Sequence, residues 1–156
     1  MANTLILGIA TMVGCMAIQC VIVSIMLRSL LVLVRRKLIQ PTLIGTTTLL
    51  SGIMVVMLAG NLGQIAIWAW VFLARGEFAD LGTAFYHSVV NFTTLGYGDL
   101  VMSEGERLLG ALEAANGIMM FGLTTAFLFA ILNELATLAW DENVDEGVDP
   151  AEPASR

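Results

Sequence analysis

The chain has 156 residues, of which 58% are hydrophobic and 13% are charged, with a formal net charge of −6 and a mean hydropathy of +0.86. Soluble domains are about 45–50% apolar and about 25% charged. This composition therefore excludes an ordinary soluble protein and indicates an integral membrane protein. The sequence also contains no basic patch of the kind that binds nucleic acid.

Three stretches are long and apolar enough to cross a bilayer, which takes about 20 residues. The first runs from Leu5 to Leu27 or Val34, the second from Leu43 to Leu73, and the third from Leu108 to Leu138. The segment from Phe78 to Phe92 is too short and too polar to cross, so we expect a re-entrant helix there. The sequence thus predicts an all-α membrane protein with three spanning helices.

Basic residues gather between the first and second spans, at Arg28, Arg35, Arg36 and Lys37. Such an excess of lysine and arginine marks the cytoplasmic loops of membrane proteins. We therefore expect the N-terminus and the re-entrant segment outside and the C-terminus in the cytoplasm.

A short motif follows the re-entrant segment, Thr93-Thr94-Leu95-Gly96-Tyr97-Gly98-Asp99. A dehydrated cation needs oxygens in place of its hydration shell, and an extended run supplies them when its backbone carbonyls face one way. That arrangement needs alternating left- and right-handed backbone, and Gly96 and Gly98 stand where positive φ costs little. The Thr94 hydroxyl can add an oxygen, while Leu95 and Tyr97 are expected to point away and pack against their surroundings.

These residues resemble the selectivity filter of tetrameric potassium channels, in particular the small bacterial channels that are little more than a pore. Residues 84–94 are similar to the pore helix of that family, and residues 116–126 to its inner helix. The resemblance covers roughly residues 42–133. It implies a homotetramer in the cell membrane, the inner membrane of a bacterium. Its only cofactor would be permeant K⁺, held by Thr94, Leu95, Gly96, Tyr97 and Gly98.

The resemblance also implies residues that support the filter. Tyr86 and His87 match pore-helix positions that hydrogen-bond to the filter, which pairs Tyr86 with Asp99 and His87 with Tyr97. Histidine stands here where the family often has tryptophan, although imidazole can also donate a hydrogen bond.

On the inner helix, Gly117 matches the hinge glycine of the family. The positions that match its pore lining recur at intervals of three or four and so share one helical face; they are Ile118, Phe121, Thr125, Phe129 and Asn133. Phe129 is the widest apolar group near the inner end. We expect a hydrophobic constriction there that opens when the helix bends near Gly117, where the missing side chain would loosen packing.

Glu113 is the acid nearest the middle of a membrane helix, one turn before Gly117. An ionised carboxylate there is costly, so it should find a partner or hold its proton. It could be a neutral group that packs behind the filter against Ser88, Asn91 or Thr93, or an ionised group that couples conduction to pH. The sequence favours the first role.

Other polar and aromatic residues are expected to have structural roles. Trp68, Trp70 and Trp140 resemble interfacial anchors. Asn61 and Gln64, one turn apart in the second span, are expected to hydrogen-bond to neighbouring helices.

The chain is thus expected to contain an additional N-terminal helix with a basic loop (residues 1–41), a channel pore domain (42–139) and an acidic, disordered tail (140–156). The predicted function is potassium conduction, not catalysis, with gating inside the pore or through a regulatory protein. One alternative is a poorly selective cation channel. Another is a non-conducting regulatory subunit. A transporter using Glu113 as a proton site would need an internal repeat, which we do not find.

Overall fold

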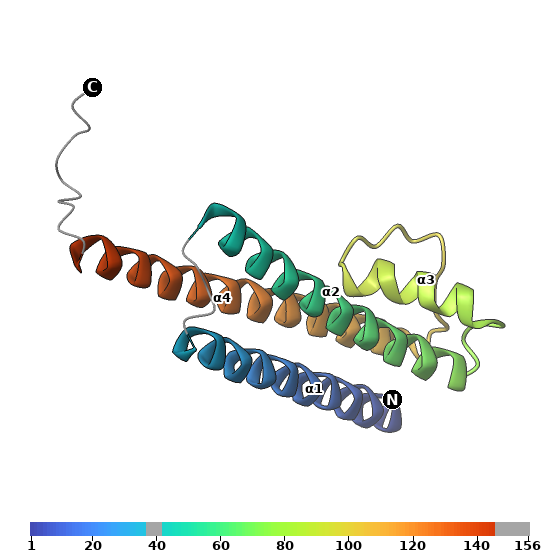
Figure 1. Cartoon of the computed structure of the whole chain (residues 1–156). Coiled ribbons are helices and arrows are strands. Elements are labelled where there is room, and N and C mark those ends of the chain that lie inside the picture. Colours follow the sequence, from blue (N-terminus) through green and yellow to red (C-terminus); the bar gives the residue numbers. More distant parts are fainter. Residues whose placement is uncertain (37–41, 146–156) are drawn as a thin grey trace.

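The computed structural model describes residues 1–36 and 42–145, which form four helices. These are α1 (Ala2–Arg35), α2 (Leu43–Ala74), α3 (Leu81–Phe92) and α4 (Arg107–Asp145). The three long helices are each long and apolar enough to cross a membrane, and they pack side by side (Figure 1). The short α3 lies at one end of the bundle, beside α2. The predicted all-α class with three candidate spans is confirmed.

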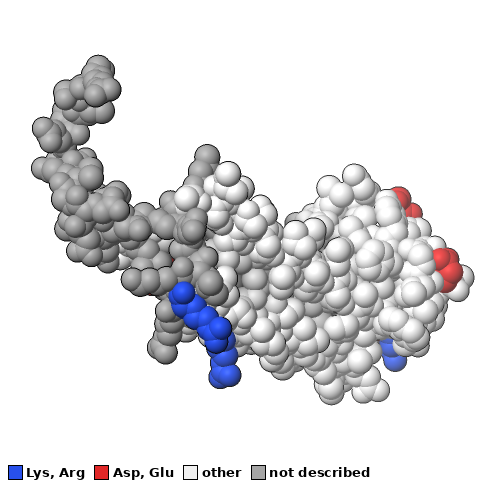
Figure 2. Space-filling view, viewed as in Figure 1, with Lys and Arg blue, Asp and Glu red and all other residues white. Residues whose placement is uncertain are grey.

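Charged side chains are confined to the two ends of the molecule on the face shown in Figure 2. Acidic residues are visible at the end that carries α3, and a broad band without charges separates the two ends. A bilayer accepts such a band because its hydrocarbon core excludes charges. The arrangement is that of a multi-pass membrane protein.

The start of α3 is fixed by a helix cap. The Asp80 carboxylate accepts hydrogen bonds from the hydroxyl of Thr83, at 2.7 Å, and from its backbone amide, at 2.9 Å. These bonds hold the pKa of Asp80 below its usual value because they stabilise the ionised form. With 12 residues, α3 is too short to cross a bilayer. It ends where the predicted filter begins.

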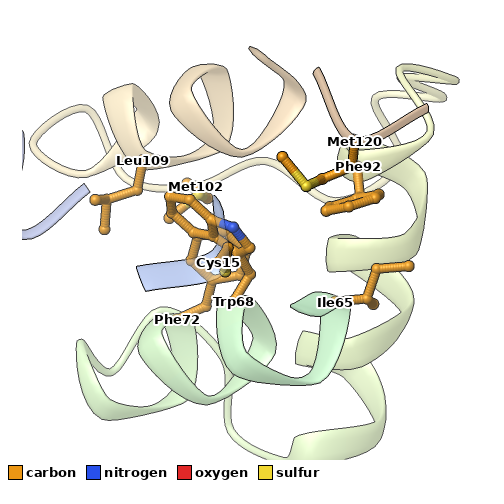
Figure 3. Close-up of a cluster of buried hydrophobic side chains, with 8 residues drawn as sticks. All are labelled: Cys15, Ile65, Trp68, Phe72, Phe92, Met102, Leu109 and Met120. Carbon is orange, nitrogen blue, oxygen red and sulfur yellow. The ribbon is translucent and has the colours of Figure 1, made fainter. Parts of the chain in front are cut away.

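A hydrophobic core lies beside α3 and receives side chains from all four helices (Figure 3). Trp68 is fully buried in this core and packs against Phe72, with the ring centroids 6.0 Å apart. The expectation that Trp68 is an interfacial anchor is therefore wrong, because its face of α2 turns toward the bundle. Trp70 is 62% exposed, as an anchor would be, and the side chain of Trp140 lies outside the described part of the chain.

The additional helix α1 is part of the bundle. Gln64 on α2 donates a hydrogen bond from Nε2 to Oε1 of Gln19 on α1, over 2.8 Å, so the expected interhelical bond of Gln64 is confirmed. Further along, Leu30 joins a second buried cluster with residues of α2 and α4, among them Ile53 and Phe127. Helix α1 therefore packs against both α2 and α4.

Helix α4 continues further than the sequence indicates. It ends at Asp145, so residues 140–145 of the predicted disordered tail are helical. The remainder of that tail, residues 146–156, lies outside the described residues.

Candidate ion-conduction site

The filter segment, residues 93–99, leaves the end of α3 and is exposed along its whole length. Gly96 and Gly98 have positive φ, 59° and 74°, as the sequence predicts. Thr94 also has a positive φ, of 60°. No sequence signal indicated this conformation, because a β-branched residue rarely takes it.

The direction of two filter carbonyls follows from the backbone hydrogen bonds. The amides of Leu95 and Gly96 both donate to the carbonyl of Val90 in α3, over 3.0 and 3.3 Å. In a trans peptide the N–H and the preceding C=O point in opposite directions, and the described chain has no cis bond. The carbonyls of Thr94 and Leu95 therefore both point away from α3, toward the exposed side.

Two side chains of the filter segment, Leu95 and Tyr97, lie largely exposed in the single chain. Leu95 is 55% exposed and Tyr97 is 66% exposed. The packing expected of these two residues is not made by their own chain. Any surface that covers them would have to come from another molecule.

One of the two predicted supporting hydrogen bonds is present. Tyr86 donates from its hydroxyl to Oδ2 of Asp99, over 2.8 Å, and so links α3 to the end of the filter segment. His87 does not bond to Tyr97 in the chain. Its Nε2 lies 2.8 Å from Nδ2 of Asn91, and its ring packs 4.7 Å from that of Phe78. The buried face of α3 holds His87, whereas Tyr97 faces outward, so the predicted pair cannot form within one chain.

The five predicted pore-lining residues of α4 lie on an exposed face of the chain; they are Ile118, Phe121, Thr125, Phe129 and Asn133. The ring of Phe121 also contacts that of Phe92 at the end of α3, edge to face, with centroids 5.7 Å apart. This contact lies between the inner helix and the residue that precedes the filter segment.

Gly117 does not have the surroundings expected of a loosely packed hinge. A Cβ atom there would lie 1.9 Å from the carbonyl oxygen of Phe92 and 2.8 Å from its carbonyl carbon. The missing side chain allows α4 to touch the backbone of α3, so the prediction that it loosens packing is wrong. At Gly122, by contrast, a Cβ atom would have no neighbour within 4 Å in the described part of the chain.

Glu113 lies against α3 and is fully buried. Its Oε1 is hydrogen-bonded with the Ser88 hydroxyl, and Asn91 lies next to it on α3. Thr93, the third partner considered, donates to the Val89 carbonyl instead, over 2.7 Å. Asn116, three residues further along α4, is also fully buried. No role was predicted for Asn116 from the sequence. Its amide side chain in an otherwise apolar helix was the signal that could have indicated one.

Two contacts at the end of the bundle that carries α3 join the loops on either side of that helix. Arg75 donates to Oε1 of Glu106, which ties the end of α2 to the start of α4. The guanidinium lowers the pKa of Glu106, so this carboxylate stays ionised to lower pH than an isolated glutamate would. Ser103 donates its amide and hydroxyl to Glu77, over 2.8 and 2.7 Å. These contacts hold the loop that follows the filter segment.

Residues 61–134 match the model of a protein family described as an ion channel. The matched range begins within α2 and contains α3, the filter segment and most of α4. No curated protein sequence and no solved structure matches the chain significantly. The match points to ion passage through a pore rather than to catalysis. The match covers just under half of the chain and supports an ion channel pore domain at residues 61–134.

Proposed function

We propose that four copies of this chain form a potassium-selective channel that conducts K⁺ passively across the membrane. The observation that carries the proposal is the direction of the Thr94 and Leu95 carbonyls, which face away from α3 on an exposed segment. Four such segments around one axis would surround a dehydrated K⁺ with rings of oxygen atoms. The Gly96 and Tyr97 carbonyls and the Thr94 hydroxyl would extend the set.

Exposure of the filter segment supports assembly into a tetramer. Polar backbone that faces lipid costs several kcal/mol for each unsatisfied group, so non-helical backbone at membrane depth must be covered by protein or border water. In the proposed assembly, neighbouring copies cover the side chains of Leu95 and Tyr97. The exposed face of α4 that includes Ile118 and Phe129, 62% and 64% exposed, borders the water-filled pore.

The proposal is tested with purified full-length protein whose mass is measured in detergent and which is then reconstituted in liposomes. We expect a tetramer that passes K⁺ and Rb⁺ far faster than Na⁺. We also expect block by Ba²⁺, because it is similar in size to K⁺ and carries twice the charge. Equal fluxes of Na⁺ and K⁺ would instead indicate a poorly selective cation channel. A tetramer without flux would indicate a non-conducting regulatory subunit.

A second test concerns the constriction proposed at Phe129. Four phenylalanine rings near the inner end of the pore would exclude water and ions when the channel is closed. We expect Phe129→Ala to raise the leak through closed channels at least severalfold, measured as K⁺ flux under conditions in which the wild type is silent. Ile25→Ala is the control, because it removes an apolar side chain of similar exposure from α1. An unchanged leak would move the closed gate to Asn133 or to the filter.

A further inference from the structure

The hydroxyl of Ser88 lies between two oxygen atoms. Its Oγ is 2.8 Å from the carbonyl oxygen of Ile65 on α2, and it is also hydrogen-bonded with Oε1 of Glu113 on α4. All three residues are buried. A serine hydroxyl has one proton to donate, and a carbonyl oxygen can only accept. One hydroxyl proton cannot make a linear hydrogen bond to both oxygen atoms, so a full hydrogen bond in the second contact needs a proton from elsewhere.

Only Glu113 can supply that proton. If Ser88 donates to the Ile65 carbonyl, the contact between Ser88 and Glu113 is a hydrogen bond when the carboxyl is protonated and donates to Oγ. If Ser88 instead donated to an ionised Glu113, the Ser88 Oγ and the Ile65 carbonyl oxygen would lie 2.8 Å apart with no proton between them. That arrangement would also leave a buried carboxylate whose Oε2 has no hydrogen-bond partner among the described residues, which is costly.

The neighbours of Glu113 provide no positive charge that would balance an ionised carboxylate. They include Cys15 on α1, the Ile65 carbonyl on α2, and Ser88 and Asn91 on α3. None of these groups is basic. A carboxylate inside a membrane helix is stabilised by a positive charge or by water, and these groups supply no positive charge.

We propose that Glu113 carries its proton at neutral pH and donates it to Ser88, which in turn donates to the Ile65 carbonyl. This relay of two hydrogen bonds joins α4, α3 and α2 behind the filter segment. Ser88 lies two residues before Val90, whose carbonyl receives the amides of Leu95 and Gly96. Glu113 and Ser88 are therefore positioning residues for the filter. Only this last step, the effect on ion passage, rests on the proposed function.

The protonation state of Glu113 is tested by infrared spectroscopy of the purified full-length protein at pH 7. A protonated carboxylic acid has a carbonyl stretching band that an ionised carboxylate lacks and that shifts in D₂O. We expect this band in the wild type and its loss in Glu113→Gln, because Glu113 is the only fully buried acid among the described residues. If the two spectra do not differ in this band, the proposal is wrong. Because the measurement needs no ion flux, it separates failure of the relay from failure of the channel function.

The hydrogen bond from Glu113 to Ser88 is tested by Ser88→Ala. Loss of the acceptor should move the carboxylic acid band, because the Glu113 carboxyl then has no hydroxyl oxygen to which to donate. Ser29→Ala is the matched control, because among the described residues the Ser29 hydroxyl donates to the Ile25 carbonyl of its own helix, over 2.9 Å. An unmoved band in Ser88→Ala would contradict donation to Ser88.

The effect on the filter is tested by two substitutions at Glu113. Glu113→Gln keeps an N–H donor, so we expect wild-type assembly and potassium selectivity. Glu113→Ala removes the donor and leaves a cavity, so we expect loss of selectivity or of the tetramer. A pH-dependent current that Glu113→Gln abolishes while the tetramer stays intact would show an ionised sensor and overturn the proposal.

Discussion

Gly117→Ala is expected to abolish potassium conduction and to destabilise the tetramer. The new Cβ would lie 1.9 Å from the carbonyl oxygen of Phe92, well inside van der Waals contact. Both sides of this contact are backbone, so no side-chain rotation relieves it and α4 must move away from α3. Overpacking of a buried site costs about 1–3 kcal/mol, and a tetramer contains four such sites. Phe92 is the last residue of α3, so the displacement reaches the filter segment directly.

Gly122→Ala is the matched control for this prediction. It makes the same change in the same helix, at a position where a Cβ has no atom of the described residues within 4 Å. Alanine is favoured over glycine inside a helix by about 0.5–1 kcal/mol, so this variant should be as stable as the wild type or more stable. Thermal stability of the tetramer and K⁺ flux into liposomes measure both variants. If Gly117→Ala conducts normally and is as stable as Gly122→Ala, the close contact between α3 and α4 is not needed to position the filter segment or to stabilise the tetramer.

Gly96→Ala is expected to reduce the ratio of K⁺ to Na⁺ flux by at least tenfold, or to stop flux altogether. The space around Gly96 is open in the chain, so the effect comes from the backbone. With φ at 59°, Gly96 has the left-handed conformation, which costs a residue with a Cβ about 1–2 kcal/mol in each copy. Return to negative φ would rotate the flanking peptide groups. The Gly96 amide would then lose its bond to Val90, and the Leu95 carbonyl would turn from the pore axis.

Gly105→Ala separates this backbone effect from a general loss of glycine. Gly105 lies in the loop before α4, has open space around it, and does not have a positive φ. We expect its substitution to leave the flux ratio unchanged. Retention of the wild-type ratio by Gly96→Ala would show that the left-handed conformation of Gly96 is not needed for selectivity.

The sequence by itself determined the features that depend on local properties of the chain. Apolar runs longer than the bilayer thickness indicated the three spans, because hydropathy is a property of the segment alone. The positions of Gly96 and Gly98 predicted positive φ, because only glycine takes that conformation at little cost. The spacing of Ile118, Phe121 and Phe129 predicted one face of α4, because a helix repeats every 3.6 residues.

The tertiary structure alone decided which faces of the helices meet. Trp68 is of a residue type that is typical of interfacial anchors, but it lies in the core because α2 turns that face toward the bundle. Gly117 had the position of a hinge but is the point where α4 touches the backbone of α3. The hydrogen bonds that connect Glu113, Ser88 and Ile65 link residues of three helices. Such contacts are set by helix rotation and depth, which hydropathy and spacing within a single helix do not specify.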